Sequence, residues 1–484
     1  MKPCNLVIIM SDEHDPRFMS HMGHPRVQTP NLDRLAARGT SFTSSYTNCP
    51  ICVPARASFA TGRYVHDNGY WDNAIAWDGK VKGWPNRLQE EGLHNATIGK
   101  LHYRLPEDPY GIDQQIEPMH IYGGTGMVWG SQRDPLPDIR GSFRMLKEIG
   151  PGESGYNRYD WRIADASSAW LQKAARLDHP HPWVLYIGFV APHFPLVAPQ
   201  KYFDPYPLED MPFPKLHPRD GYKRHPWVED HARFTQTDDQ FTNEQQRMLA
   251  IAAYHALCTF LDEQIGKVLD KMDQTGLADT TRIIYTSDHG DNVGARGMWG
   301  KSVLYEEASR IPMIISGPDV PQGLTVATPT TLVDIYPTVI DGVGLDLTEE
   351  EEVTLPGRSL FDLAKQSEDP DRPALSEYHA IGSNSAAFML RKGRYKYHYY
   401  VGHVPELFDL ETDPEETTDL AHDSSNIETL ANFEHLLRSI VDPEDVDQRA
   451  KADQRALIES YGGWEKARKF GAPGATPAPG AGFE

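Results

Sequence analysis

The stretch Cys49–Arg63 contains the residues with the clearest potential for chemistry. Cys52, Pro54 and Arg56 stand at alternate positions in it, and a Thr-Gly turn follows. Three interpretations compete. Cys52 could be a structural thiol, because free cysteine packs as a small hydrophobe. Together with Cys49 it spells C-x-x-C, which suits a redox pair or half a zinc site. In the third interpretation, Cys52 is not used as a thiol at all.

The other cysteines count against zinc. Only Cys4 and Cys258 lie outside the motif, so a four-cysteine zinc site would need scattered ligands. Four cysteines without a regular framework are typical of a reducing compartment. The apolar run near the start is too short for a signal peptide, and no stretch reaches the roughly 20 apolar residues of a membrane span. We therefore expect a cytoplasmic protein that contacts no membrane.

Ionisable residues follow four apolar runs. Any one of them alone could belong to an ordinary loop at a strand end. Together they supply oxygen and nitrogen ligands for a hard divalent ion, with Ca²⁺ favoured and Mn²⁺ or Mg²⁺ as alternatives. The residues are Asp12-Glu13, Lys100 with His102, His193, and Asp288-His289.

Positive charge and proton carriers complete this set. Arg56, Lys100 and Lys301 could hold a tetrahedral oxyanion, and His102 and His193 could pass protons near neutral pH. An ester anion held between a metal and several cations, with a nucleophile below it, is the arrangement that sulfuryl or phosphoryl transfer needs.

Buried strands must position these groups. Apolar, β-branched runs predict strands at 6–10, 93–99, 183–190, 282–286 and 312–315. Helices are predicted at 29–39, 164–176, 243–272 and 303–309, and another after Cys52 with 57–60 as its first full turn. The alternation predicts an α/β fold, a large mixed, mostly parallel sheet sandwiched by helices. Its sites are expected at the carboxyl ends of the strands.

Three regions are predicted along the chain. Residues 1–370 form the catalytic α/β domain, and within it 104–159 and 202–237 are expected to be irregular. Residues 371–441 form an α+β subdomain with a small antiparallel sheet and a hairpin around Lys392-Gly393. Residues 442–484 form a helix and a flexible Gly/Pro/Ala arm, which could strap across a partner in a homo-oligomer.

The net charge of −22 argues against a general nucleic-acid binder, because such binding depends on basic surface. It does not exclude an anionic substrate, which meets only the local field of its pocket.

The order of the motifs resembles the sulfatase branch of the alkaline phosphatase superfamily. The similarity covers nearly the whole chain to about residue 421 and is closest to the choline sulfatase and phosphonate monoester hydrolase group. It is carried by Asp12, C-x-P-x-R with Thr61-Gly62, Gly99-Lys100-x-His102, Ala191-Pro-His193, Ser287-Asp-His-Gly290, Trp299-Gly-Lys301, 310–315, 334–338 and 407–414.

The resemblance implies that a maturation enzyme oxidises Cys52 to formylglycine, whose hydrate is the nucleophile. Arg56 would stabilise that hydrate, and Lys100 and Lys301 would bind the sulfate oxygens. His102 would assist breakdown of the sulfated intermediate, while His193 would lie near the leaving oxygen.

The resemblance also implies a metal held by Asp12, Asp288, His289 and the converted Cys52, with Glu13 as a further ligand. Glu13 stands where many sulfatases have aspartate, and His289 where many have asparagine. Val53 and Ala55 replace the usual small or hydroxyl residues of the motif.

Two further features concern the substrate. Asn73 has the spacing of a substrate-contacting asparagine in that group, although an Asn in a turn is an equal alternative. Tyr70, Trp71, Trp77 and Trp129 could form an aromatic cage for a quaternary ammonium, or simply pack in the core.

We therefore predict a sulfuric ester hydrolase that acts on a small anionic ester, an organic sulfate. The alternatives are a phosphonate monoester hydrolase or phosphodiesterase on the same site, and, more distantly, a non-catalytic binding protein.

Overall fold

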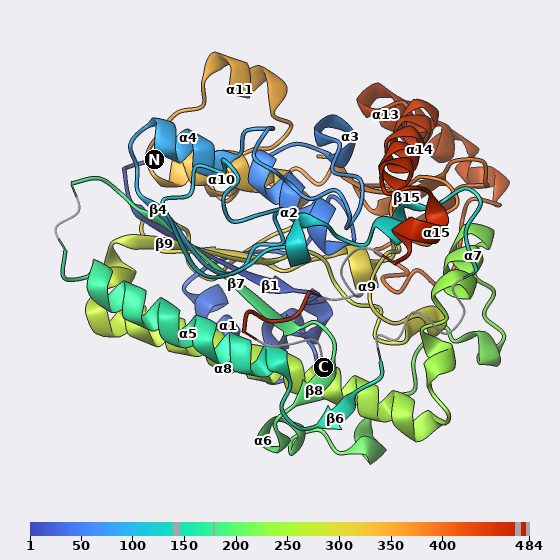
Figure 1. Ribbon diagram of the computed structural model, residues 1–484, viewed down its shortest axis with the longest axis horizontal. Coiled ribbons are helices and arrows are strands. Elements are labelled where there is room, and N and C mark those ends of the chain that lie inside the picture. The colour runs from blue at the N-terminus through green and yellow to red at the C-terminus, as the bar shows by residue number, and fades with distance from the viewer. Residues whose placement is uncertain (139–145, 178–179, 470–475, 481–484) are drawn as a thin grey trace.

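An eight-stranded sheet forms the centre of the computed structural model, which describes residues 1–138, 146–177, 180–469 and 476–480 (Figure 1). The two pairings of β10 are antiparallel and the others are parallel, which confirms the predicted mixed, mostly parallel sheet. The strands are, in spatial order, β11 (Leu324–Val326), β2 (Gly39–Phe42), β10 (Met313–Ser316), β9 (Thr281–Ser287), β1 (Asn5–Asp12), β7 (Val184–Pro192), β4 (Asn95–Lys100) and β5 (Gln114–Met119).

Strand β1 shows why the sheet is buried on both faces. Val7 and Ile9 pack into one apolar cluster, whereas Ile8 and Met10 pack into another, because side chains alternate along a strand. Helices α1 (Pro30–Ala37), α5 (Gly155–Ala174) and α8 (Glu244–Thr275) cover the first face. Helices α2 (Cys52–Thr61), α4 (Trp84–Glu90) and α10 (Ile335–Gly342) cover the second (Figure 1).

A second, antiparallel sheet lies in the C-terminal region. It has the order β13 (Ala374–Tyr378), β14 (Ala387–Lys392), β15 (Tyr395–Tyr400) and β16 (Glu406–Asp409), so the predicted hairpin is confirmed. Helices α13 (Ile427–Ile440) and α14 (Pro443–Ser460) accompany it. Lys396 is fully buried and lies 2.9 Å from both Glu306 and Glu416, so an ion-pair network ties this sheet to the main body.

Shorter elements complete the chain. They are β3 (Ser45–Tyr46), α3 (Val65–Asn68), β6 (Ile149–Pro151), β8 (Leu196–Ala198), α6 (Gln200–Phe203), α7 (Pro226–Thr235), α9 (Glu306–Ser309), β12 (Thr330–Thr331), α11 (Glu349–Thr354), α12 (Leu360–Leu363) and α15 (Trp464–Ala467). Among the described residues, no helix is both long enough and apolar enough to span a bilayer.

Several predicted boundaries were wrong. Strand β5 lies inside the segment expected to be irregular; it is an edge strand that contains Pro118 and lacks a continuous apolar run. Helix α5 begins at Gly155 because Ser154 and Asn157 cap it reciprocally. Helix α2 begins at Cys52, not a turn later, since a proline at the third position needs no N–H partner. Helix α9 begins at Glu306, after a stretch in which Ser302 has a φ of 82°.

Candidate active site

Four adjacent parallel strands end at the same edge of the sheet. Strands β9, β1, β7 and β4 are neighbours, and their carboxyl ends carry Asp288, Asp12, His193 and Lys100, respectively. The predicted sites at four strand ends, far apart in sequence, are therefore brought together.

Cys52 faces this edge as the first residue of α2. Its side chain is 1% exposed, and its Sγ lies 3.3 Å from His289 Nε2 and 3.8 Å from Asp12 Oδ1. The Lys301 ammonium donates to the same sulfur at 3.2 Å. Free N–H groups and the positive end of the helix dipole make a helix start suitable for an anion.

Arg56 lies one turn into α2 and joins the carboxylates of two strands. Its Nε donates to Asp288 Oδ2 at 2.8 Å and its Nη2 to Asp12 Oδ2 at 2.9 Å. Nη1 donates to the Lys100 carbonyl and to the Tyr186 hydroxyl, both at 3.0 Å. Arg56 thereby fixes the orientation of both acids.

Asp12, Cys52, Asp288 and His289 could hold a metal. One ligand atom from each lies within 4.8 Å of the others, and all four residues are buried. The His289 Nδ1 contacts the Gly290 carbonyl at 3.0 Å, which leaves the Nε2 lone pair directed towards the cluster. Lys100 and Arg56 bind Oδ2 of Asp12, so Oδ1 remains for an ion. The donor set fits a divalent cation.

Glu13 lies beside this cluster rather than within it. Its Oε2 contacts Lys301 Nζ at 3.2 Å and His193 Nε2 at 3.4 Å. Burial raises the pKa of Glu13 well above its ordinary value. Its backbone has a φ of 70°, and its N–H donates to Asp288 Oδ1 at 3.1 Å. Glu13 forms a second group of possible metal-ligand atoms, together with Asp12 and His193.

The two predicted histidines are neutral groups at the pocket. Burial, and then the charge of Lys100, holds the pKa of His102 well below its usual range, and its ring nitrogens make no hydrogen bond. Burial, and then Lys301, also lowers the pKa of His193, whose Nδ1 lies 2.6 Å from the Phe194 carbonyl.

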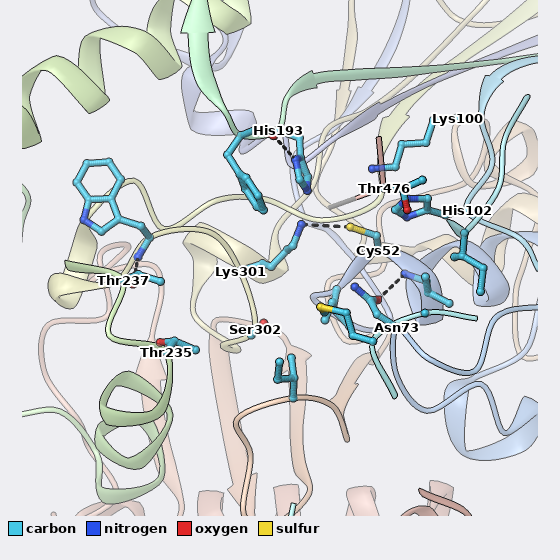
Figure 2. A pocket seen from close by; sticks show the side chains of 18 of the residues that line it. Cys52, Asn73, Lys100, His102, His193, Thr235, Thr237, Lys301, Ser302 and Thr476 are labelled. Carbon is cyan, nitrogen blue, oxygen red and sulfur yellow. Dashed lines mark hydrogen bonds between the residues drawn. The ribbon is translucent and has the colours of Figure 1, made fainter. Parts of the chain in front are cut away.

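A pocket of about 790 Å³, measured with its open mouth, lies above Cys52. Figure 2 shows Cys52, Lys301 and His193 at its centre, with Lys100 and His102 to one side. The lining residues are Ile51, Cys52, Val53, Asn73, Lys100, His102, Ile121, Gly126, Met127, Tyr156, His193, Phe194, His231, Thr235, Thr237, Trp299, Lys301, Ser302, Ile381 and Thr476.

Asn73 lies in a turn and lines the pocket, and it also has a structural role. Its Oδ1 accepts a hydrogen bond from the Val53 N–H at 3.1 Å, close to the start of α2. The NH₂ group of the Asn73 side chain therefore remains available to donate a hydrogen bond to a substrate.

Of the two interpretations of the aromatic residues near Cys52, packing in the core is confirmed and the cage is not. Tyr70, Trp71 and Trp77 are core residues, with at most 6% of the side chain exposed, and Trp129 packs against the C-terminal apolar cluster. None of the four is among the residues that line the pocket in the described part of the chain.

Comparison with known proteins identifies the family. The sulfatase family profile matches residues 4–345, which is more than half of the chain. The chain belongs to the sulfatase family. This sulfatase also matches the profile "N-sulphoglucosamine sulphohydrolase, C-terminal" over residues 294–442.

Individual relatives of this sulfatase agree with that placement. It is 30% identical to a choline-sulfatase of Rhizobium meliloti, over 93% of this chain and 89% of that one. It is also 30% identical to arylsulfatase K of Bos taurus, over 90% and 81% of the two chains. The phosphonate monoester hydrolase of Agrobacterium radiobacter has the same fold, with a TM-score of 0.71 at 22% identity, covering 90% and 95%. The sulfatase is thus a sulfuric ester hydrolase of the alkaline phosphatase superfamily.

The C-terminal residues of this sulfatase reach the pocket. Thr476 lines it, and its carbonyl accepts the Tyr156 hydroxyl at 2.5 Å. Arg162 donates to the Pro479 carbonyl at 2.7 Å, and Ala478 is buried in the main apolar cluster. Residues 476–480, predicted as a flexible arm, therefore lie against their own chain, whereas 470–475 and 481–484 fall outside the described residues.

Other pocket residues had no recognisable signal in the sequence. Thr235 and Thr237 lie in a segment predicted to be irregular. Tyr186, whose hydroxyl accepts a hydrogen bond from Arg56, is the third residue of β7, and its place within an apolar run gave no signal of this role either.

Removal of residues 470–484 is expected to raise the KM for a sulfate ester several-fold and to change kcat less, because a pocket wall is lost while the reacting groups remain. Thr476→Ala is the matched control: the bond to Tyr156 is made by the backbone carbonyl of Thr476, so this variant should behave nearly as wild type. Steady-state kinetics of both variants test this. An unchanged KM in the truncated enzyme would contradict the assignment of Thr476 to the pocket wall.

Proposed function

We propose that this chain hydrolyses a small organic sulfate monoester through a formylglycine derived from Cys52 and a divalent metal. The position of Cys52 carries the proposal. Its sulfur stands where one oxygen of the formylglycine hydrate would sit, at a helix start and within 3.8 Å of Asp12, His289 and Lys301. A thiol buried among acids is a poor nucleophile, because burial, and then Asp12, raises its pKa.

The metal would be held by Asp12, Asp288, His289 and the side-chain oxygen of the converted residue. Such an ion polarises the ester oxygens and lowers the pKa of a bound hydroxyl. The two carboxylates suit Ca²⁺, with Mg²⁺ or Mn²⁺ as alternatives, and the imidazole suits Mn²⁺ better than the other two. Because Glu13 pairs with Lys301 and His193, we assign it to positioning these two groups rather than to the metal.

The remaining side chains bind the ester and move protons. Lys100 and Lys301 would bind the sulfate oxygens, and Arg56 would hold both metal-ligating carboxylates. The converted residue would supply a geminal diol. One of its oxygens would take the sulfuryl group as the bond from sulfur to the alcohol oxygen breaks. The other would then form the aldehyde carbonyl as the carbon–oxygen bond to the sulfated oxygen breaks and sulfate leaves, and water would restore the diol. His193 would share a proton with the leaving alcohol oxygen, and His102 would take the proton released when sulfate departs.

A phosphonate monoester hydrolase is the second candidate, since phosphate and sulfate groups are nearly isosteric and a phosphonate monoester hydrolase shares the fold. We expect kcat/KM for 4-nitrophenyl sulfate to exceed that for 4-nitrophenyl phenylphosphonate. Parallel measurements with one enzyme preparation decide between the candidates. A much higher kcat/KM on the phosphonate would overturn the first choice.

Removal of the metal with EDTA is expected to abolish turnover, and Ca²⁺, Mn²⁺ or Mg²⁺ should restore it. Independently of activity, a metal at 100 times its Kd should stabilise the folded protein by about 2.7 kcal/mol, seen as a higher Tm. Asp12→Asn should lose this Tm shift, whereas Asp270→Asn, at an exposed ion pair, should keep it. Full activity of metal-free protein would exclude the metal site.

Other predictions remain to be tested. We retain the division at about residues 370 and 441, the maturation enzyme as a partner, and the cytoplasmic location. Self-association through the C-terminal arm also stays a prediction.

A further inference from the structure

The pocket wall outside the groups proposed to bind sulfate, Lys100 and Lys301, carries no negative charge. Among the described residues that line the pocket, none has a carboxylate. The acids of the site lie beneath it and are engaged: Asp12 is paired with Arg56 and Lys100, and Glu13 with Lys301. The charged groups that do line the pocket are the ammonium groups of Lys100 and Lys301. A cationic alcohol would meet like charge and no counter-ion.

The aromatic rings at the pocket each contact another ring. The Phe194 ring stacks on His193 at 4.0 Å between ring centres, and the Lys301 ammonium lies 5.6 Å from its centre. Trp299 packs against Phe241 at 4.8 Å. Tyr156 meets His193 at an interplanar angle of 70°. Each of these rings already packs on another group, so part of the ring surface that a quaternary ammonium would need is taken.

Neutral hydrogen-bonding groups lie at the other end of the pocket. Figure 2 shows Thr235 and Thr237 on the opposite side of Lys301 from Lys100 and His102. The Thr235 hydroxyl donates to the His231 carbonyl at 3.1 Å, and the Thr237 hydroxyl accepts a hydrogen bond from the backbone N–H of Trp299 at 3.1 Å. Burial lowers the pKa of His231 to about 4, so its imidazole is neutral at pH 7. Because its proton is already donated, the Thr235 hydroxyl can offer only lone pairs to a ligand.

Much of the remaining pocket wall is apolar. Burial of an apolar ligand surface against this wall would be favourable. The apolar lining residues are Ile51, Val53, Ile121, Met127 and Ile381.

We infer that the ester hydrolysed here is the sulfate of a neutral, largely apolar alcohol with a hydrogen-bonding group at its far end, and not that of a cationic alcohol. This inference rests on the proposed function, because it concerns the leaving group of the same reaction. The substrate inferred here therefore differs from the cationic one in the name of the choline-sulfatase relative.

Two isosteric esters test the inference. Choline O-sulfate and 3,3-dimethylbutyl sulfate have the same shape and differ in one positive charge. We expect kcat/KM to favour the neutral ester at least about tenfold, because the cation loses hydration without gaining a partner. Equal values, or a preference for choline O-sulfate, would overturn the inference.

The methylphosphonate monoesters of the same two alcohols separate this inference from the proposed function. If both sulfates are inert and the neutral phosphonate is preferred, the proposed function fails, while the preference for a neutral leaving alcohol stands. If the sulfates are hydrolysed without preference, the proposed function stands and the inference fails.

A charge placed in the wall gives a second test. Met127 is buried and lines the pocket, and Glu and Gln are close to it in length. Met127→Glu should shift the ratio of the two kcat/KM values towards the choline ester by about tenfold, which a single favourable charge contact can supply. Met127→Gln should leave the ratio near that of wild type. Equal ratios in the two variants would mean that the leaving group does not meet this wall.

Discussion

Replacement of Cys52 by alanine is expected to lower kcat by about 10⁴-fold or more, because the nucleophile is lost while the rest of the site remains. The side chain is buried and small, so the far-ultraviolet circular dichroism spectrum and the Tm should change little. Turnover of a sulfate ester under single-turnover conditions measures the effect. Retained activity would mean that another group is the nucleophile.

Cys49→Ala is the matched control. Cys49 is fully buried, belongs to the C-terminal apolar cluster and forms no disulfide with Cys52. Its removal should leave kcat within a few-fold of wild type. An equal loss of kcat in both variants would favour the interpretation of Cys49 and Cys52 as a redox pair. Mass spectrometry of the peptide containing Cys52, after co-expression with a maturation enzyme, should show the aldehyde, and an unmodified thiol in active enzyme would contradict the proposal.

Replacement of Arg56 by alanine should have the largest effect on stability. Two buried carboxylates, those of Asp12 and Asp288, would lose the guanidinium that joins them at 2.9 and 2.8 Å. Breaking such a pair leaves uncompensated buried charge and costs roughly 3–5 kcal/mol of unfolding free energy. Activity should fall as well, since both acids lose their fixed orientation. Denaturant unfolding monitored by tryptophan fluorescence measures the difference.

Arg63→Ala provides the comparison. Arg63 lies just beyond the same helix and makes exposed hydrogen bonds to Thr354. Its loss should change stability by no more than about 0.5 kcal/mol, as for most surface positions. Equal stability of the two variants would show that Arg56 is dispensable for the buried charges. Added divalent metal should restore part of the stability lost in Arg56→Ala, because a cation can replace the guanidinium between the carboxylates.

The main sheet and the centre of the site could be predicted from the sequence because both depend on local signals. Continuous apolar runs such as Leu6–Met10 predicted buried strands, and the polar residues that follow them fell at one edge since the strands are parallel. Strand β5 escaped prediction because an edge strand with Gln, Glu and Pro has neither a continuous apolar run nor a clear period of two.

The pocket wall could not be predicted for a different reason. Met127 and Thr476 come from irregular or terminal segments, and His231 comes from α7, a helix inside a stretch that was predicted to be irregular. Their meeting depends on long-range packing that leaves no periodic pattern. The aromatic residues near Cys52 showed the same limit. Their types suited a cage, but the apolar surface of Trp77 contributes more when buried against Tyr103 and Tyr110.

The burial of Cys52 has a consequence for the order of events during synthesis. A maturation enzyme needs an accessible peptide, whereas the folded chain leaves 1% of this side chain exposed and places Thr476 in the pocket wall. Ribosomes add about 5–20 residues per second, so tens of seconds separate the emergence of these two residues. On the proposed chemistry, oxidation of the cysteine must occur within that interval or on the unfolded chain. A cell that folds this protein faster than it oxidises it would accumulate a permanently inactive form.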